Sequence, residues 1–131
     1  MPSTKSRLIA LAALASAVTV PTAGAAAAAD APPAADAPHA QVAGVIHANG
    51  AIKYAKNIVS VSRPAVGVYC VHTNMDVTRT VPSATPWYTG RIVSASVDPS
   101  AQCGNRTDTV RVVVTDSAGR RENSAFSLIL P

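Results

Sequence analysis

The sequence predicts an all-β protein, and a small antiparallel β-sandwich of about the size of an immunoglobulin domain is the favoured architecture. Three observations support this prediction. Several short segments of residues 41–131 alternate apolar and polar side chains with a period of two. Gly, Pro, Asn and Asp cluster between these segments, as they do in turns. No window in this range has the apolar period of a helix. A small β-barrel is the alternative, since the same strands could build either and the sequence does not give their order.

The first two predicted strands form a hairpin. QVAGVIH (residues 41–47) leads into Asn49 and Gly50, and AIKYA (residues 51–55) returns from them. An Asn-Gly pair favours a two-residue type I′ turn because both residues tolerate a positive φ. We therefore expect a tight turn of this type.

The next two predicted strands lie on either side of a short break. NIVSVSR (residues 57–63) alternates Val59 and Val61 with serines, which is typical of a half-buried strand. The proline and glycine within residues 64–67 interrupt this pattern. GVYCVHT (residues 67–73) then begins a strand that carries a cysteine in an apolar stretch.

The last three predicted strands are residues 90–97, 108–116 and 123–130. In each of them, alternate residues are apolar and are expected to face the core. The turn at residues 117–120 contains Gly119, the expected residue of positive φ. The predicted inward residues are Val93, Ala95, Val97, Val110, Val112, Val114, Phe126, Leu128 and Leu130.

The N-terminal residues 1–28 have the three parts of a secretory signal peptide. Lys5 and Arg7 precede an uncharged apolar run, and small residues with Ala-x-Ala spacing follow it. The apolar run is shorter than the roughly 20 residues that a spanning helix needs. We expect export with cleavage near residues 25–29, and no membrane span.

Residues 29–40 are mostly Ala, Pro and Asp without an apolar period, which predicts a disordered leader. Residues 41–131 then form a single β domain, because no length remains for a second one. A domain of this size buries only about 60 to 65% of the surface of its unfolded chain. Its core alone is therefore expected to be marginally stable.

The two cysteines, Cys70 and Cys103, are expected to form a disulfide because export places them in an oxidising compartment. A bridge that closes a loop of this length stabilises a fold by about 3.5 kcal/mol in the chain-entropy model. A catalytic Cys70 would have to escape this pairing. A zinc site built on Cys70, Cys103 and His72 lacks the paired spacing of such sites. We expect no metal and no cofactor.

A hydrolase site is the enzymatic alternative. His47 and His72 are candidate bases, and Asp76 and Asp98 are candidate acids that could join one of the serines. However, the sequence has no Gly-x-Ser-x-Gly elbow, and its aspartates lie in predicted turns, where they are common on conformational grounds. No catalytic residue is therefore assigned.

The segment TVPSATPWYTG (residues 80–90) contains the only tryptophan, Trp87, followed by Tyr88. On a loop above a rigid sheet, these aromatic residues could contact a sugar or a partner protein. Alternatively, Trp87 plugs one end of a core that is poor in aromatic residues. Burial is the favoured interpretation, because small sandwiches commonly bury their single tryptophan.

The charge of the chain gives no sign of a nucleic-acid partner. The chain has eleven Lys and Arg and seven Asp and Glu, and removal of Lys5 and Arg7 leaves nine against seven. These basic residues are scattered and do not form a stripe interleaved with aromatic residues. We therefore expect no binding to nucleic acid.

The succession of NIVSVSR, GVYC, QCGN and TVRVVVTDSAG, with a final strand that contains Phe126, resembles a group of small, uncharacterised exported β-rich proteins of actinobacteria. The resemblance extends over residues 41–131 and includes the Ala-rich signal peptide. It implies a secreted, disulfide-stapled β domain and brings no catalytic residues.

Together these features predict a secreted, non-enzymatic binding module or a surface or matrix component. Its expected partner is an extracellular protein or polysaccharide, and association with the cell wall is left open. The alternatives are a small secreted hydrolase, and an inhibitor or toxin that uses the 82–90 loop.

Overall fold

The computed structural model describes residues 31–131, so the predicted signal peptide lies outside the described residues. These residues form eight strands and one short 3-10 helix. The elements are β1 Val42–Ile46, β2 Ile52–Lys56, β3 Ile58–Ala65, β4 Val68–Thr73, β5 Ser83–Pro86, β6 Arg91–Ser96, η1 Ala101–Cys103, β7 Thr109–Asp116 and β8 Phe126–Leu130.

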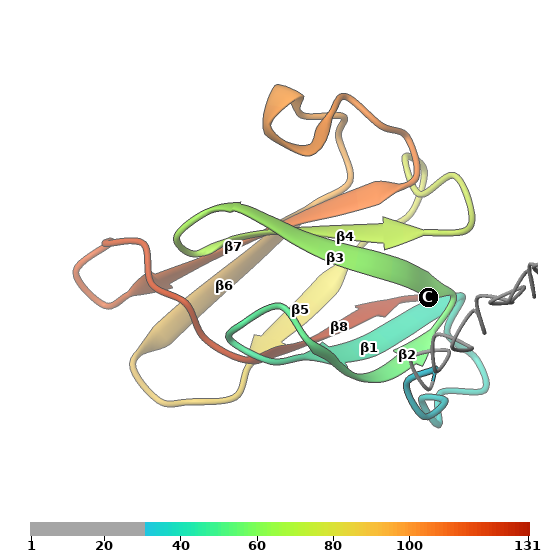
Figure 1. The fold of residues 1–131 in the computed structure, drawn as a ribbon, viewed down its shortest axis with the longest axis horizontal. Coiled ribbons are helices and arrows are strands. Elements are labelled where there is room, and N and C mark those ends of the chain that lie inside the picture. Colours follow the sequence, from blue (N-terminus) through green and yellow to red (C-terminus); the bar gives the residue numbers. More distant parts are fainter. Residues whose placement is uncertain (1–30) are drawn as a thin grey trace, which may run out of the picture. The chain divides into compact units, whose positions relative to one another are not determined.

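The strands form two four-stranded antiparallel sheets that pack together as a β-sandwich (Figure 1). Sheet A has the order β2-β1-β8-β5, and sheet B has the order β3-β4-β7-β6. The predicted all-β sandwich is therefore confirmed. The strand order came from the structure, because each sheet joins strands that are far apart in sequence.

The core lies between the two sheets and uses the alternation seen in the sequence. The predicted inward residues of β7 and β8 are confirmed, and Val112, Phe126 and Leu128 are all 0% exposed. At the centre, the rings of Tyr69 and Phe126 meet edge to face, with centroids 5.0 Å apart. The Tyr69 hydroxyl donates a 2.6 Å hydrogen bond to the carbonyl oxygen of Ala48, which satisfies its polar end.

The β1–β2 hairpin differs from the predicted type I′ turn. Gly50 has a positive φ of 86°, but Asn49 does not, so the two-residue turn is wrong. Gly50 N–H instead donates to His47 O at 2.9 Å, and His47 N–H donates to Ala51 O at 2.8 Å. The four-residue turn from His47 to Gly50 thus ends in a left-handed glycine, as is common in a three-residue hairpin loop. The Asn49 side chain accepts from Ala51 N–H, which favours this longer turn.

Strand β3 departs from simple alternation. Val59, which was predicted to share the inner face with Val61, is 66% exposed. The pairing of β3 with β4 shifts between Ile58 and Ser60, so a β-bulge changes the face of the residues that precede it. Ile58 and Val61 pack against the core instead. This bulge and a second register shift, between Ser62 and Ala65, also protect this edge strand from pairing with another chain.

The described part of the predicted leader lies along the outer edge of β2. Ala34 pairs with Ala55 in a parallel bridge, supported by hydrogen bonds of 3.0 Å from Ala55 N–H to Pro33 O and from Ala35 N–H to Ala55 O. The ammonium group of Lys56 donates to the carbonyl oxygen of Ala37 at 2.8 Å. This segment therefore covers an edge that would otherwise present free backbone groups.

Gly67, in the turn between β3 and β4, is expected to tolerate no side chain. Its φ is +69°, and an added Cβ would lie 2.5 Å from the carbonyl oxygen of Val114 and 2.8 Å from the amide nitrogen of Glu122. Gly67→Ala should lower the free energy of unfolding by about 2 to 3 kcal/mol, because the left-handed backbone is strained and backbone atoms must move.

The matched control for this prediction is Gly119→Ala. Gly119 also has a positive φ, of +83°, but an added Cβ would meet nothing within 4 Å. Its substitution should cost only the backbone strain, about 1 kcal/mol. Urea unfolding of both variants measures the difference. Equal losses at Gly67 and Gly119 would show that the close approach at Gly67 has no energetic effect.

Candidate functional site

The segment that was predicted to be one long loop, residues 80–90, contains a strand. Residues 83–86 form β5, an edge strand paired antiparallel with β8. The backbone N–H of Trp87 extends this pairing by donating to the carbonyl oxygen of Ala125 at 3.2 Å. The 82–90 loop is therefore reduced to the exposed turn of residues 87–90, which leads into β6.

Trp87 is exposed, so the favoured prediction of its burial is wrong. Its exposed fraction is 43%, and its indole N–H donates a 2.7 Å hydrogen bond to the Ser127 hydroxyl. The reason is the period of two along β5, where Ala84 and Pro86 take the more buried positions and Thr85 is exposed. Trp87 comes one residue after Pro86, so its ring lies outside sheet A.

Trp87 belongs to a cluster of side chains on the outside of sheet A. The ammonium nitrogen of Lys53 lies 5.0 Å from the centroid of the Trp87 ring and 5.4 Å from that of Tyr54. Such cation–π contacts hold the three side chains together at the surface. Tyr54 is itself 40% exposed. We call Trp87, Tyr54, Lys53 and Ser127 the aromatic surface.

A pocket of about 360 Å³ adjoins the aromatic surface and shares Tyr54 and Ser127 with it. Its floor comes from β1 and β8, and residues 34–37 beside β2 contribute a wall. Most of its lining is apolar, and Asp36 adds one carboxyl group. A pocket with apolar walls and a few polar groups can enclose part of a small ligand or one side chain of a partner.

Tyr88, the second aromatic residue predicted for ligand contact, is 61% exposed. It follows Trp87 at the start of the turn that leads to β6. The structure therefore leaves both predicted aromatic residues accessible. The part of the surface that the sequence did not reveal is Lys53 and Tyr54 on β2, more than 30 positions earlier in the chain.

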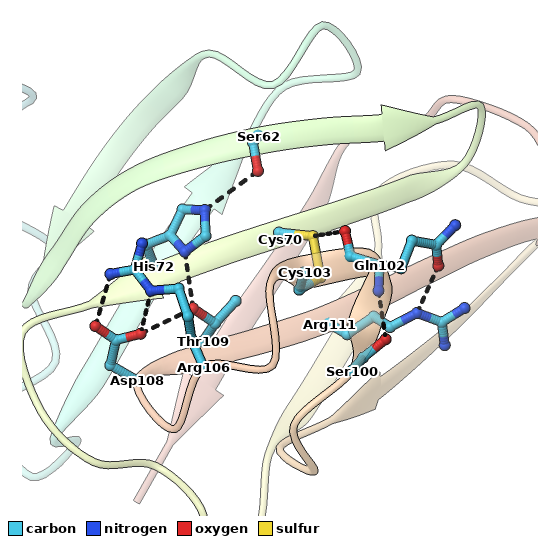
Figure 2. Close-up of a disulfide and its surroundings, with 10 residues drawn as sticks. All are labelled: Ser62, Cys70, His72, Ser100, Gln102, Cys103, Arg106, Asp108, Thr109 and Arg111. Carbon is cyan, nitrogen blue, oxygen red and sulfur yellow. Dashed lines mark hydrogen bonds and ion pairs between the residues drawn. A yellow bond between two sulfur atoms is a disulfide. The ribbon is translucent and has the colours of Figure 1, made fainter.

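The disulfide between Cys70 and Cys103 is confirmed, with a Cα–Cα distance of 5.6 Å (Figure 2). It ties the middle of β4 to η1, the short helix in the connection between β6 and β7. Gln102 adds to this attachment, because its side-chain oxygen accepts from Arg111 Nε on β7 at 2.9 Å. The connection is thus fixed to the outer face of sheet B.

His72 lies on β4, two residues after Cys70, and contacts two hydroxyl groups (Figure 2). Its Nδ1 is 2.7 Å from the Thr109 hydroxyl on β7, and its Nε2 is 3.2 Å from the Ser62 hydroxyl on β3. Thr109 in turn donates to the Asp108 carboxylate at 3.0 Å. We call Ser62, His72, Thr109 and Asp108 the serine–histidine chain.

The structure does not bring the predicted hydrolase residues together. His47 is exposed at the end of β1 in sheet A, whereas His72 belongs to sheet B. Asp76 accepts hydrogen bonds from the backbone N–H and the hydroxyl of Thr78, within its own turn. Asp98 is exposed in the bend that follows β6. Asp76 therefore has the conformational role that its position in a turn suggested.

The electrostatics of the serine–histidine chain favour a neutral imidazole beside an ionised carboxylate. Partial burial and the nearby Arg106 guanidinium lower the pKa of His72 below its ordinary value of 6.5. Hydrogen bonds from Arg106, above all, lower the pKa of Asp108 to about 2. Arg106 makes these bonds with two nitrogens, at 2.8 and 2.7 Å.

Residues 31–131 contain neither a cluster suited to a metal ion nor a helix suited to a membrane span. No three His, Cys, Asp or Glu side chains gather there in a group that could hold a metal ion. No helix in the same range is long and apolar enough to cross a membrane.

Comparison with known proteins gave no match to a family model, to a curated protein or to a solved structure. The resemblance to exported actinobacterial proteins therefore stays a prediction.

Proposed function

We propose that this protein is a secreted binding module that holds an extracellular polysaccharide or protein on the aromatic surface. The signal-peptide pattern of residues 1–28 supports export. The disulfide is compatible with an oxidising extracellular setting. Retention at the cell wall would follow if the ligand is a wall component.

The observation that carries this proposal is the exposed but fixed ring of Trp87. A large aromatic side chain at the surface is costly to hydrate, and its burial against a ligand recovers that free energy. The hydrogen bond to Ser127 and the contact with Lys53 hold the ring in one position before any ligand arrives. A ring that is already ordered loses little conformational entropy on binding.

Binding should depend strongly on Trp87. Trp87→Ala is expected to weaken binding about 30-fold, which corresponds to the roughly 2 kcal/mol typical of a central aromatic contact. Because Trp87 is the only tryptophan, its fluorescence reports on this surface alone. The measurement is a fluorescence titration of the secreted protein with cell-wall polysaccharides and extracellular proteins, followed by calorimetry of the variant with the ligand found.

The matched control is Ile92→Ala. Ile92 is a large apolar residue, 57% exposed, on β6 of sheet B rather than on sheet A. Its loss should leave affinity unchanged. Equal affinity of wild type and Trp87→Ala would show that the ligand binds elsewhere. The absence of any fluorescence change across both ligand classes would contradict the proposed function.

A further inference from the structure

The serine–histidine chain is an unbroken series of hydrogen bonds across three adjacent strands of sheet B. It begins at the hydroxyl of Ser62 on β3, passes through the ring of His72 on β4 and reaches Thr109 on β7 (Figure 2). It ends at the carboxylate of Asp108, the residue before Thr109. Backbone pairing between these strands sets the positions of the side chains, so the arrangement rests on rigid elements.

The direction of every proton in the chain follows from its ionised end. The Asp108 carboxylate only accepts hydrogen bonds, so the Thr109 hydroxyl donates to it. Because the single proton of Thr109 is then committed, its oxygen accepts from Nδ1–H of His72. The neutral imidazole therefore has a bare Nε2, which accepts the proton of the Ser62 hydroxyl.

The solvent exposure of the three side chains agrees with these donor and acceptor roles. Ser62 is exposed and can meet a molecule from solvent, whereas His72 is half-buried. Thr109 is only 3% exposed and accepts from the side of the ring that faces away from Ser62. A hydroxyl bonded to the bare nitrogen of a histidine whose other nitrogen is oriented by a third group is the arrangement of an activated nucleophile.

We propose that Ser62 is an acyl-accepting nucleophile for small carboxylic esters, with His72 as its general base. Ser62 Oγ forms a bond to the ester carbonyl carbon while its proton moves to Nε2 of His72. The bond from that carbon to the alcohol oxygen then breaks, and the alcohol leaves with the proton from His72. Water, activated by the same nitrogen, hydrolyses the serine ester and releases the carboxylic acid.

Thr109 and Asp108 are positioning residues in this scheme, because they act through His72. Arg106 supports them by holding the carboxylate of Asp108 with two nitrogens. Figure 2 shows the Arg106 guanidinium beside the His72 ring, on the surface formed by the disulfide-bound connection.

This activity goes beyond the proposed binding function and does not depend on it. The aromatic surface belongs to sheet A, whereas the serine–histidine chain belongs to sheet B. Ester cleavage should therefore proceed whether or not a ligand occupies the aromatic surface. Either proposal can fail while the other stands.

The test uses the secreted protein and p-nitrophenyl acetate. Release of p-nitrophenol is followed by absorbance, and the acetyl group is located by mass spectrometry of peptides after acid quenching. The expected result is acetylation of Ser62 and its loss in Ser62→Ala. His72→Gln should slow acetylation about 100-fold, the typical contribution of a positioned general base. Ser60→Ala, at a neighbouring exposed serine of β3, is the matched control and should react like wild type.

The pH dependence of the reaction rate distinguishes a reactive serine–histidine chain from one that has only a structural role. The wild-type rate should rise as His72 loses its proton and reach a plateau above about pH 6.5, the ordinary pKa of histidine. In Asp108→Asn, loss of the carboxylate charge that raises the pKa of His72 should move this rise to lower pH and reduce the plateau. Acetyl groups found only on lysines or on the ring of His72, or equal rates for Ser62→Ala and wild type, would overturn the proposal.

Discussion

Removal of the Cys70–Cys103 disulfide is expected to lower the free energy of unfolding by about 3.5 kcal/mol. The bridge joins residues 33 positions apart, so reduction gives the unfolded chain the entropy of a large open loop. It also frees the connection around η1 from β4. The loss is a large fraction of the 5 to 15 kcal/mol that is typical of a whole domain.

The measurement is urea unfolding of the oxidised protein, of the protein reduced with a phosphine, and of Cys70→Ala/Cys103→Ala. The reduced wild type and the double variant should unfold at similar urea concentrations, well below the oxidised protein. The difference between the reduced wild type and the double variant measures the packing of the two sulfur atoms alone. Cys70 and Cys103 are 1% and 8% exposed. Equal midpoints for the oxidised and reduced proteins would refute a stabilising role for the bridge.

Phe126→Ala should lower the free energy of unfolding by about 3 to 5 kcal/mol. Phe126 is 0% exposed, and its ring meets that of Tyr69 at 5.0 Å. Its strand, β8, lies between β1 and β5 in sheet A, so the cavity would open in the interior of the core between the sheets rather than at its edge. Surrounding side chains on β-strands cannot collapse fully into such a space, which adds a cavity cost to the lost apolar burial.

The control lies on the same strand. Ile129 is also a large apolar residue of β8, but it faces outward and is 48% exposed. Ile129→Ala is expected to cost about 1 kcal/mol or less, since a half-exposed side chain loses less burial. Chemical unfolding of both variants gives the comparison. Similar costs at the two positions would mean that the core is not centred on the Tyr69–Phe126 pair.

Most of the strands could be predicted from the sequence because an antiparallel strand with one buried face alternates in composition. This held for β6, β7 and β8, whose predicted inward residues pack as expected. It failed at Val59, because a bulge changes which face a residue takes without changing the residue types nearby. It also failed at the hairpin turn, where an Asn-Gly pair is compatible with more than one loop length.

The candidate sites were less predictable than the strands. The disulfide was predicted because the chain was expected to be exported, and two cysteines in an oxidising compartment can pair in only one way. Trp87 was named, but its favoured burial was wrong because residues 83–86 form a strand whose register turns Trp87 outward. Ser62, His72 and Thr109 come from three strands separated in sequence. Their proximity depends on strand order, which local patterns do not encode.

The sequence by itself thus determined the all-β class, most strand positions, most of the core faces and the disulfide pair. Each of these depends on local periodicity or on a count of cysteines. Tertiary structure alone decided the order of the strands in each sheet, the hydrogen-bond partners of His72 and the contact between Lys53 and Trp87. The physical reason is that pairing between strands depends on the fit of the whole core, to which every strand contributes.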